Sequence, residues 1–283
     1  MQHARGVLEP SVTIVVVGAG SMIARALRQQ PASAGWRYLA HGEALGERAW
    51  LAGARCVVNL AFDPRLKAEP YDPARDVDLR LAGMLAEHEA AYVMVSTRMV
   101  YGLPPPDGRL SEEIAPQPAN YYGRAKLAAE RAVAGLLGNR LTVLRLSNIF
   151  DVSEAEGGRR SFFGIATTAL REQGRIVLDI SPFVERDFLS AALCAKRIAT
   201  VAVRPLPGLF NVGAGSPVPT GRIAQWLIAG FGSGSLLISN MREYDGFWLD
   251  IERSRRAWGF APVSAAEIRD DCIAIGRHLR GLT

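Results

Sequence analysis

Hydrophobic runs of strand length alternate with stretches of helical periodicity over the first half of the chain. The runs are continuous, as in Thr13-Ile14-Val15-Val16-Val17, which is typical of strands covered by helices on both faces. We predict strands at Val12–Val17, Arg37–Ala40, Cys56–Ala61, Tyr92–Ser96 and Leu141–Leu146, and helices at Met22–Gln30, Asp76–Ala90 and Tyr122–Leu137. This alternation indicates βαβ units, and therefore an α/β fold with a Rossmann-like, doubly wound parallel sheet.

The rhythm changes after Phe150. The segment Asp151–Arg160 is polar and contains glycines, and shorter mixed elements follow it. We predict strands at Ile176–Asp179 and Leu209–Val212, and helices at Leu189–Val203 and Gly221–Phe231. The sequence therefore predicts a first domain over residues 1–150 and a smaller, mixed α/β region over residues 151–283, from which a segment of about 187–213 returns to the main sheet.

Composition and charge exclude several classes of protein. The formal net charge is +5 and the pI is about 9.4, but acidic residues are interspersed throughout, so the charge does not indicate a nucleic-acid-binding arm. Cys56, Cys194 and Cys272 form no CxxC pair, which fits neither a disulfide scaffold nor a thiolate metal site. No stretch has the length and apolarity of a membrane span. We expect a soluble, cytoplasmic protein without a metal.

A glycine turn follows the first predicted strand, where Gly18-Ala19-Gly20-Ser21 runs directly into a helix. Glycine permits a positive φ and the close approach of a ligand, and the free amides of a helix N-terminus favour an anion. A plain tight turn would use the same residues, but the position after the first strand of a βαβ unit favours a dinucleotide pyrophosphate. The candidate cofactor-binding residues in this turn and helix are Gly18, Gly20, Ser21, Met22, Ile23 and Arg25.

The end of the second predicted strand bears on the choice between NADP and NAD. A carboxylate there accepts a hydrogen bond from the ribose 2′-hydroxyl of NAD and repels the 2′-phosphate of NADP. The sequence Tyr38-Leu39-Ala40-His41-Gly42 has no acid before Glu43. With His41 at the strand end and Arg25 on the preceding helix, the sequence favours NADP. NAD remains the alternative, because a two-residue shift of the strand end would bring Glu43 to this position.

Tyr122 and Lys126 are four residues apart, on one face of a predicted helix. A phenol has a pKa near 10, so proton transfer at neutral pH requires a drop of roughly 3 units, which a fixed ammonium nearby can supply. Lysine is rare in this chain, so the spacing is informative, although a surface helix would tolerate the same pair. Thr97 ends the fourth predicted strand at the sheet edge where ligands bind, either as a cap or as a donor to a substrate oxygen.

Together these residues resemble the extended short-chain dehydrogenases/reductases, a group of NAD(P)-dependent sugar-nucleotide epimerases, dehydratases and reductases. The resemblance covers nearly the whole chain. Besides the glycine turn, it rests on Val58-Asn59-Leu60-Ala61, Ser96-Thr97 through Val100-Tyr101-Gly102, Ser111-Glu112-Glu113 with Pro118 and Tyr122 to Lys126, Arg145-Leu146-Ser147-Asn148, Arg186-Asp187-Phe188, Phe210-Asn211-Val212-Gly213 and Asp250 to Pro262.

The resemblance implies roles for the matching residues. Tyr122 would be the catalytic acid/base, Lys126 would bind the nicotinamide ribose and lower the pKa of Tyr122, and Thr97 would hold the reacting oxygen. Asn59, Leu60 and Ala61 would line the cofactor, and Asn148 and Arg186 would contact a nucleotide sugar. An arginine fork suits the diphosphate of such a substrate, but a surface ion pair with Asp187 or Glu185 is the alternative for Arg186.

The sequence departs from the family pattern at three places. Ser21 and Ala24 replace glycines, which narrows the pyrophosphate pocket. Arg98-Met99 stands where the 4,6-dehydratases of the family have Asp-Glu, so the elimination of water lacks its acid and base. Ser190-Ala191-Ala192 replaces acidic residues that commonly follow the Arg-Asp-Phe element.

We therefore expect an oxidoreductase in which residues 1–150 bind NAD(P) and residues 151–283 mainly bind the substrate. The favoured reaction is reduction of a nucleotide-linked keto sugar, and epimerisation of a nucleotide sugar is the alternative because it would use the same Tyr122, Lys126 and Thr97. A non-catalytic NADP-binding sensor or partner subunit on the same fold is the alternative from another class. The expected partners are a small-molecule nucleotide sugar and, by resemblance, a second copy of the chain in a homodimer, without nucleic acid or membrane.

Overall fold

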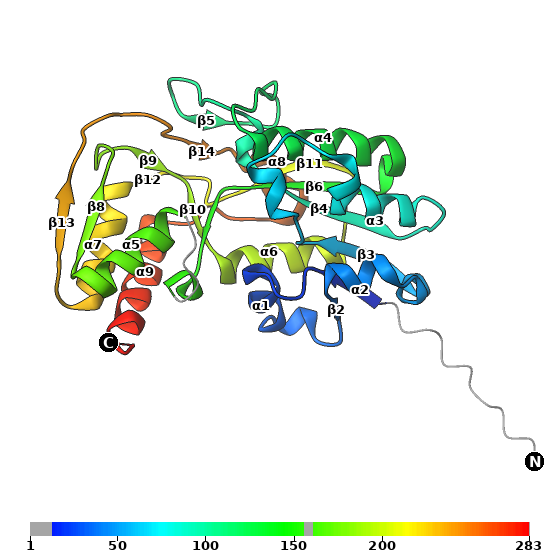
Figure 1. The fold of residues 1–283 in the computed structure, drawn as a ribbon, viewed down its shortest axis with the longest axis horizontal. Helices are drawn as coiled ribbons and strands as arrows, with labels where there is room; N and C mark the ends of the chain where they lie inside the picture. Colours follow the sequence, from blue (N-terminus) through cyan, green and yellow to red (C-terminus); the bar gives the residue numbers. More distant parts are fainter. Residues whose placement is uncertain (1–12, 156–160, 283) are drawn as a thin grey trace, which may run out of the picture.

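The central sheet of the computed structural model contains six parallel strands in the order β11-β6-β4-β3-β1-β2 (Figure 1). The structure describes residues 13–155 and 161–282, so Val12 and residues 156–160 of the polar stretch lie outside the described residues. The strands are β1 (Thr13–Val17), β2 (Arg37–Leu39), β3 (Ala54–Asn59), β4 (Ala91–Thr97), β6 (Leu141–Leu146) and β11 (Gly208–Val212). The predicted α/β fold with a doubly wound parallel sheet is confirmed.

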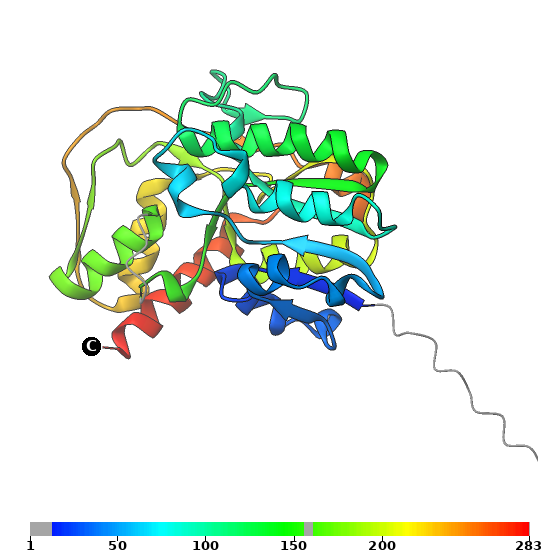
Figure 2. The same cartoon turned by 45° about the vertical axis from the view of Figure 1, so that its right-hand side comes forward.

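Helices cover both faces of this sheet (Figure 2). Successive side chains of β1 point to opposite faces, so Val16 packs in one hydrophobic cluster, whereas Val15 and Val17 pack in the other. The first cluster includes residues of α1 (Met22–Arg28) and α6 (Ala191–Val203), and the second includes residues of α2 (His41–Gly46), α3 (Val77–Leu85) and α4 (Tyr121–Leu137). Ligands of such sheets bind at the carboxyl ends of the strands, beside the point where the strand order reverses, which here lies between β1 and β3.

Several element boundaries differ from the expectation by a few residues, as three examples show. Helix α3 ends at Leu85 rather than Ala90. Helix α6 begins at Ala191, because Phe188–Ser190 form strand β10 and pair with β7 (Asn148–Phe150). Helix α4 begins at Tyr121, after Asn120, whose side chain accepts a hydrogen bond from the Gly123 amide at 2.8 Å and caps the helix.

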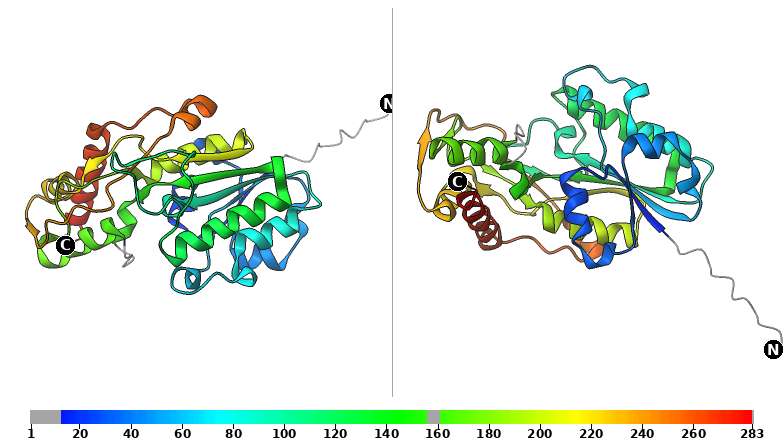
Figure 3. Two further views of the ribbon diagram at one scale, coloured as in Figure 1. Left: turned by 90° about the horizontal axis from the view of Figure 1, so that it is seen from above. Right: turned by 60° about the horizontal axis from the view of Figure 1, so that its bottom comes forward.

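A second group of elements packs beside the sheet (Figure 3). It contains α5 (Phe162–Gln173), α7 (Thr220–Phe231), α9 (Ala265–Arg280) and the parallel pair β8 (Arg175–Leu178) and β13 (Ser235–Ile238). The sequence analysis did not predict α5, α9 or β13. Helix α9 has a sequence signature that could have revealed it, since Ser264 and Glu267 form a capping box.

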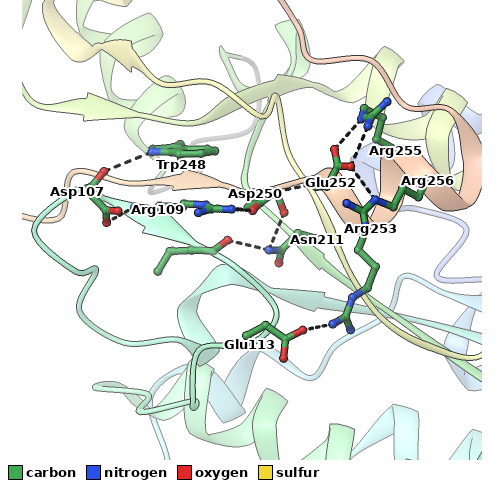
Figure 4. A network of polar contacts seen from close by, with 11 residues as sticks. Asp107, Arg109, Glu113, Asn211, Trp248, Asp250, Glu252, Arg253, Arg255 and Arg256 are labelled. Atoms are coloured by element: carbon green, nitrogen blue, oxygen red, sulfur yellow. Dashed lines mark hydrogen bonds and ion pairs between the residues drawn. The ribbon is translucent and has the colours of Figure 1, made fainter.

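Short strand pairs tie the two groups of elements together. Strand β9 (Glu185–Arg186) pairs with β12 (Val218–Pro219), and β5 (Arg109–Leu110) pairs with β14 (Trp248–Leu249) ahead of helix α8 (Glu252–Trp258). Figure 4 shows the polar contacts around β14, among them Arg109 on Asp250 and the Asn211 side-chain amide on the Asp250 carbonyl. The 3-10 helices are η1 (Pro31–Ser33), η2 (Ala49–Leu51), η3 (Pro64–Lys67), η4 (Pro73–Arg75), η5 (Arg98–Val100), η6 (Gly138–Arg140) and η7 (Val152–Ala155).

None of the helices in residues 13–155 and 161–282 has the length and apolarity needed to cross a bilayer. Over the same ranges, no cluster of three or more His, Cys, Asp or Glu side chains could hold a metal ion.

Because two cysteines are buried, the unfolding free energy of the protein should fall at alkaline pH. Burial raises the pKa of the Cys56 and Cys194 thiols to about 12, from 9.0 for a free thiol. The native state therefore keeps these protons at pH values where the unfolded chain loses them. The unfolding free energy should fall as pH rises from about 9 towards 12, by up to roughly 1.4 kcal/mol per pH unit for each thiol.

Urea unfolding at pH 8.5 and 10.5 checks this expectation. The Cys56→Ala/Cys194→Ala variant should lose less stability between the two pH values than the parent protein, whatever its stability at pH 8.5. An equal loss in the two proteins would contradict the assignment.

Candidate active site

The glycine turn between β1 and α1 is shaped for a ligand. Gly18 has φ +96°, and a Cβ there would lie 2.8 Å from the Ala61 amide nitrogen, so only glycine fits beside the end of β3. A Cβ at Gly20 would meet nothing within 4 Å, so open space lies next to this backbone. The Ser21 hydroxyl accepts a hydrogen bond from the Ala24 amide at 3.1 Å and caps α1. These residues fit the pyrophosphate of a dinucleotide.

The other predicted residues of this turn and helix make packing contacts or hydrogen bonds within the protein. Met22 is buried, and Ile23 packs half-buried against the same hydrophobic cluster. Arg25 donates to the Gly20 carbonyl and to the Ser153 hydroxyl, both at 3.0 Å, so it stabilises the turn. The sequence analysis did not single out Arg28, although its guanidinium lies 4.4 Å from the ring centre of Tyr38 in β2.

The end of β2 presents no carboxylate before the first turn of α2. His41 is the first residue of α2 and is exposed. Glu43 follows in the same turn, and its Oε1 lies 4.0 Å from an Arg37 nitrogen. His41 and Glu43 therefore both lie in the first turn after β2, and Arg37 lies near Glu43.

Hydrogen bonds from backbone amides fix the conformation of the segment at the end of β3. Asn59 is buried, and its Oδ1 accepts from the Ala61 amide at 2.9 Å. The Leu60 amide donates to the Val17 carbonyl at 2.9 Å, which joins this segment to the end of β1. Asn59, Leu60 and Ala61 therefore lie next to the glycine turn, as the close approach of Gly18 to Ala61 shows.

Tyr122 lies in the first turn of α4, close to the end of β4. A Cβ at Gly123 would clash with the Met99 carbonyl, so the glycine lets α4 press against the chain that follows Thr97. The half-buried Tyr122 ring packs edge-on against Phe62, with ring centres 5.0 Å apart. The Lys67 ammonium lies 5.4 Å from the centre of the Tyr122 ring. The sequence analysis did not identify Phe62 and Lys67 as neighbours of this phenol.

Lys126 is buried beneath Tyr122, with an exposed fraction of 3%. Its Nζ donates to Asp78 Oδ2 at 2.9 Å and to the Val95 carbonyl at 2.8 Å. Burial lowers the pKa of Lys126, but the Asp78 carboxylate and the Tyr122 phenol raise it, and the net pKa lies above its usual value. Lys126 is therefore a fixed ammonium at neutral pH, not a solvated surface lysine.

Asp78 anchors this ammonium and was not predicted as a site residue. Its Oδ1 accepts from Asn59 Nδ2 at 2.7 Å and from the Tyr92 hydroxyl at 2.8 Å, while Oδ2 faces Lys126. Burial and the nearby Asp78 raise the pKa of Tyr92 well above 10. This phenol therefore stays protonated at neutral pH and donates a hydrogen bond to Asp78. The signal in the sequence was an acidic pair, Asp76 and Asp78, at the start of a helix.

Thr97 is the last residue of β4 and is buried. Its Oγ1 accepts a hydrogen bond from the Met99 amide at 3.2 Å, so the residue caps η5. A hydroxyl that accepts one hydrogen bond still has its own hydrogen to donate, so the cap does not exclude a contact with a substrate oxygen.

Two predicted substrate residues lie on short strands outside the central sheet. Asn148 begins β7, where its partner in the register is Phe188 of β10. Arg186 ends β9, and the ion pair predicted as its alternative, with Asp187 or Glu185, is wrong: its partner is Asp245, at 3.7 Å. Arg186 also lines a cavity of about 200 Å³ with, among others, Phe162, Ile176, Leu178 and Tyr244.

Asp187 is fully buried and organises the backbone beside Arg186. Its carboxylate accepts from the amides of Ala214, Gly215 and Leu249 at 2.7, 3.1 and 3.1 Å. Burial raises the pKa of Asp187, and the amide hydrogen bonds oppose that effect. The carboxylate thus joins three segments that are distant in sequence.

Asp187→Ala should lower the unfolding free energy by about 3 kcal/mol or more, because three buried amides lose their acceptor. Denaturant unfolding at neutral pH measures the loss. Asp270→Ala is the control, since Asp270 is exposed and pairs with Arg269, and it should change stability by less than about 0.5 kcal/mol. Equal effects of the two substitutions would contradict this role of Asp187.

Comparison with known proteins identifies the family. A family model described as the RmlD substrate binding domain matches residues 12–176, more than half of the chain. The chain belongs to this family. The resemblance to the extended short-chain dehydrogenases/reductases is thereby confirmed, since the RmlD family lies within that superfamily. The family comprises sugar-nucleotide reductases and epimerases.

Individual relatives of this RmlD family member are distant. A dTDP-4-dehydrorhamnose reductase from Mycolicibacterium smegmatis is 30% identical over 133 residues, which covers 42% of this chain and 41% of that protein. Among solved structures, RMD from Pseudomonas aeruginosa complexed with NADPH is 21% identical, with a TM-score of 0.75 over 96% of this chain and 100% of that one. The UDP-glucose 4-epimerase from Thermotoga maritima with UDP-glucose is 17% identical, with a TM-score of 0.78 over 94% and 99%. These structures share the fold.

Proposed function

We propose that this chain is an NADP-dependent oxidoreductase that reduces a nucleotide-linked keto sugar, with Tyr122 as the acid/base. The observation that supports this most is the buried Lys126 ammonium, held by Asp78 and the Val95 carbonyl one helical turn from Tyr122. A buried charge with two fixed partners next to a half-buried phenol is costly for a purely structural helix. The M. smegmatis reductase supports the same reaction class.

Each residue has a distinct task in the proposed reaction. Tyr122 donates its hydroxyl proton to the sugar oxygen as the carbonyl carbon is reduced. Lys126 places a positive charge below the phenol and stabilises the phenolate that remains. Thr97 donates a hydrogen bond to the same sugar oxygen and orients the carbonyl.

The cofactor would lie over the glycine turn and the adjoining Asn59–Ala61 segment. The bound nicotinamide supplies the hydride. Gly20 leaves open space for the pyrophosphate, Gly18 lets the turn lie against Ala61, and Lys126 would face the nicotinamide ribose. We favour NADP over NAD because the end of β2 has no carboxylate before Glu43, and Arg28 lies against Tyr38 there. The 2′-phosphate would find Arg28 and His41, rather than the predicted Arg25, within its neighbourhood.

The substrate would bind with its sugar at Tyr122 and Thr97 and its nucleotide towards Arg186. Asn148 and Arg186 come from β7 and β9, on the side of the sheet edge where the second group of elements packs. Residues 1–150 would thus mainly bind the cofactor, and residues 151–283 would supply most of the nucleotide contacts. The absence of carboxylates at Arg98-Met99 argues against dehydration.

Cofactor stoichiometry tests the proposal. Purified protein is mixed with NADPH or NADH and a panel of dTDP- and UDP-linked 4-keto sugars, and both cofactor oxidation and sugar products are measured. A reductase consumes one reduced cofactor per product and prefers NADPH. Turnover of a nucleotide sugar without net cofactor consumption would instead show an epimerase. Cofactor binding without hydride exchange would favour the non-catalytic alternative. A homodimer is proposed by family resemblance, and sedimentation measures it directly.

A further inference from the structure

The buried Arg98 and the half-buried Asp245 form an ion pair for which the proposed reaction has no direct use. Arg98 follows Thr97 at the end of β4 and is 7% exposed. Its two terminal nitrogens donate to the two Asp245 carboxylate oxygens, both at 2.6 Å. The guanidinium also lies 4.0 Å from the ring centre of Phe247. Arg98 thus fastens segment 245–247 to the end of the active-site strand.

This pair is a poor explanation of stability alone. Desolvating two charges offsets much of their attraction, so an apolar pair of similar volume would serve a purely structural contact as well. The Arg98 Nε is buried and has no hydrogen-bond partner among the described residues, so the cost of desolvating this donor is not offset by a hydrogen bond. The arrangement therefore suggests a task beyond packing.

Asp245 in turn holds Arg186 through its main chain. The Arg186 Nε donates to the Asp245 carbonyl at 3.1 Å. Asp245 has φ 56° and is the one non-glycine residue with positive φ in the described part of the chain. Aspartate tolerates this conformation better than most residues, and the Arg98 fork fixes its carboxylate. The Phe247 amide also donates to the Glu185 carbonyl at 2.9 Å, which keeps the segment alongside β9.

The terminal nitrogens of Arg186 are available to bind a ligand. They make no hydrogen bond within residues 13–155 and 161–282, and the nearest carboxylate oxygen is the one on Asp245, at 3.7 Å. The groups that act electrostatically on Arg186 are Asp245, Arg98, Tyr244 and Asp179. Arg186 lines the 200 Å³ cavity with apolar side chains such as Phe162 and Ile176. An oriented guanidinium at the edge of an apolar cavity suits a phosphate attached to a flat base.

We propose that Arg98 and Asp245 are positioning residues for Arg186 in the binding of a nucleoside diphosphate. The Arg98 fork fixes Asp245, and the Asp245 carbonyl holds the Arg186 Nε, so that the terminal nitrogens face the diphosphate. Because Arg98 directly follows Thr97, the same contacts fix the diphosphate-binding arginine relative to the residue that orients the reacting carbonyl. This inference rests on the proposed function and specifies how its substrate is held.

Four variants test the inference. Asp245→Asn keeps the main-chain carbonyl and tolerates a positive φ, but loses the charge. Arg98→Met keeps an apolar stem of similar length and loses the fork. Arg186→Met is the reference for loss of the phosphate ligand. Arg109→Met is the matched control, because Arg109 also ties the chain after β4 to the segment around β14, through Asp250, but contacts neither Asp245 nor Arg186.

Calorimetry gives the Kd of dTDP, UDP and NADPH for each protein, and thermal unfolding confirms that each is folded. Arg98→Met and Asp245→Asn should each raise the Kd of the preferred nucleoside diphosphate at least fivefold. The Kd of the double variant should not exceed the higher of the two single-variant values. NADPH affinity should stay within twofold in every variant, and Arg109→Met should bind both ligands like the parent. With a keto-sugar substrate, KM should rise while kcat stays within about twofold. If Arg98→Met does not fold, Asp245→Asn provides the test.

Three outcomes would overturn the inference, and they are distinguishable. Unchanged diphosphate affinity in Asp245→Asn, with a large loss in Arg186→Met, would show that the pair is structural only. Unchanged affinity in Arg186→Met would remove Arg186 from the substrate site and the positioning role with it. A parent protein that binds NADPH but neither dTDP nor UDP would contradict the nucleotide-sugar part of the proposed function itself.

Discussion

Tyr122→Phe is expected to lower kcat by about 10³-fold, within the range that positioned proton donors contribute to catalysis. The substitution removes the proton that the sugar oxygen receives. It keeps the aromatic ring, which packs against Phe62 and beside Lys67, so the fold of the site should not change. NADPH affinity should stay within twofold. Single-turnover oxidation of NADPH in the presence of a keto-sugar substrate measures the chemical step.

Tyr121→Phe is the matched control for this prediction. Tyr121 is the adjacent residue in the same helical turn, and it is 42% exposed. Its phenol should contribute nothing to the reaction, so this variant should react at the parent rate. A Tyr122→Phe protein that reacts within threefold of the parent would show that Tyr122 is not the acid/base.

Asp78→Ala should lower the unfolding free energy by about 3–5 kcal/mol, the usual effect of leaving one charge of a buried pair unpaired. Lys126 and Asp78 are 3% and 1% exposed, and water cannot replace the lost carboxylate without rearrangement. The Asn59 amide and the Tyr92 hydroxyl lose their acceptor at the same time. Urea unfolding at pH 7 measures the loss.

A double variant separates the structural and catalytic parts of this pair. Asp78→Ala/Lys126→Met removes both charges, so it should be more stable than Asp78→Ala alone, but it should remain inactive because the ammonium below Tyr122 is gone. Glu172→Ala removes an exposed ion pair with Arg171 and should change stability by less than about 1 kcal/mol. If Asp78→Ala resembled Glu172→Ala, the Asp78–Lys126 contact would not be a buried ion pair in solution.

Local pattern was enough to predict most of the first half of the fold. The βαβ rhythm and the tyrosine and lysine of α4 depend on periodicity and spacing, which neighbouring residues determine. The second half was harder to predict, because β7, β9, β10 and β12 are each two or three residues long and exist only by pairing with distant partners. Such strands have no periodicity of their own to detect.

The sequence by itself determined which chemical groups stand at the carboxyl edge of the sheet, because each follows a strand or opens a helix within its own local segment. Gly18, Thr97, Tyr122 and Lys126 are of this kind. The tertiary structure alone decided how these groups are held. Asp78 reaches Lys126 across 48 residues, and Asp245 reaches Arg98 across 147. A charge in the interior is stable only with a partner in contact, and the chain path, not the local sequence, decides which residue that partner is.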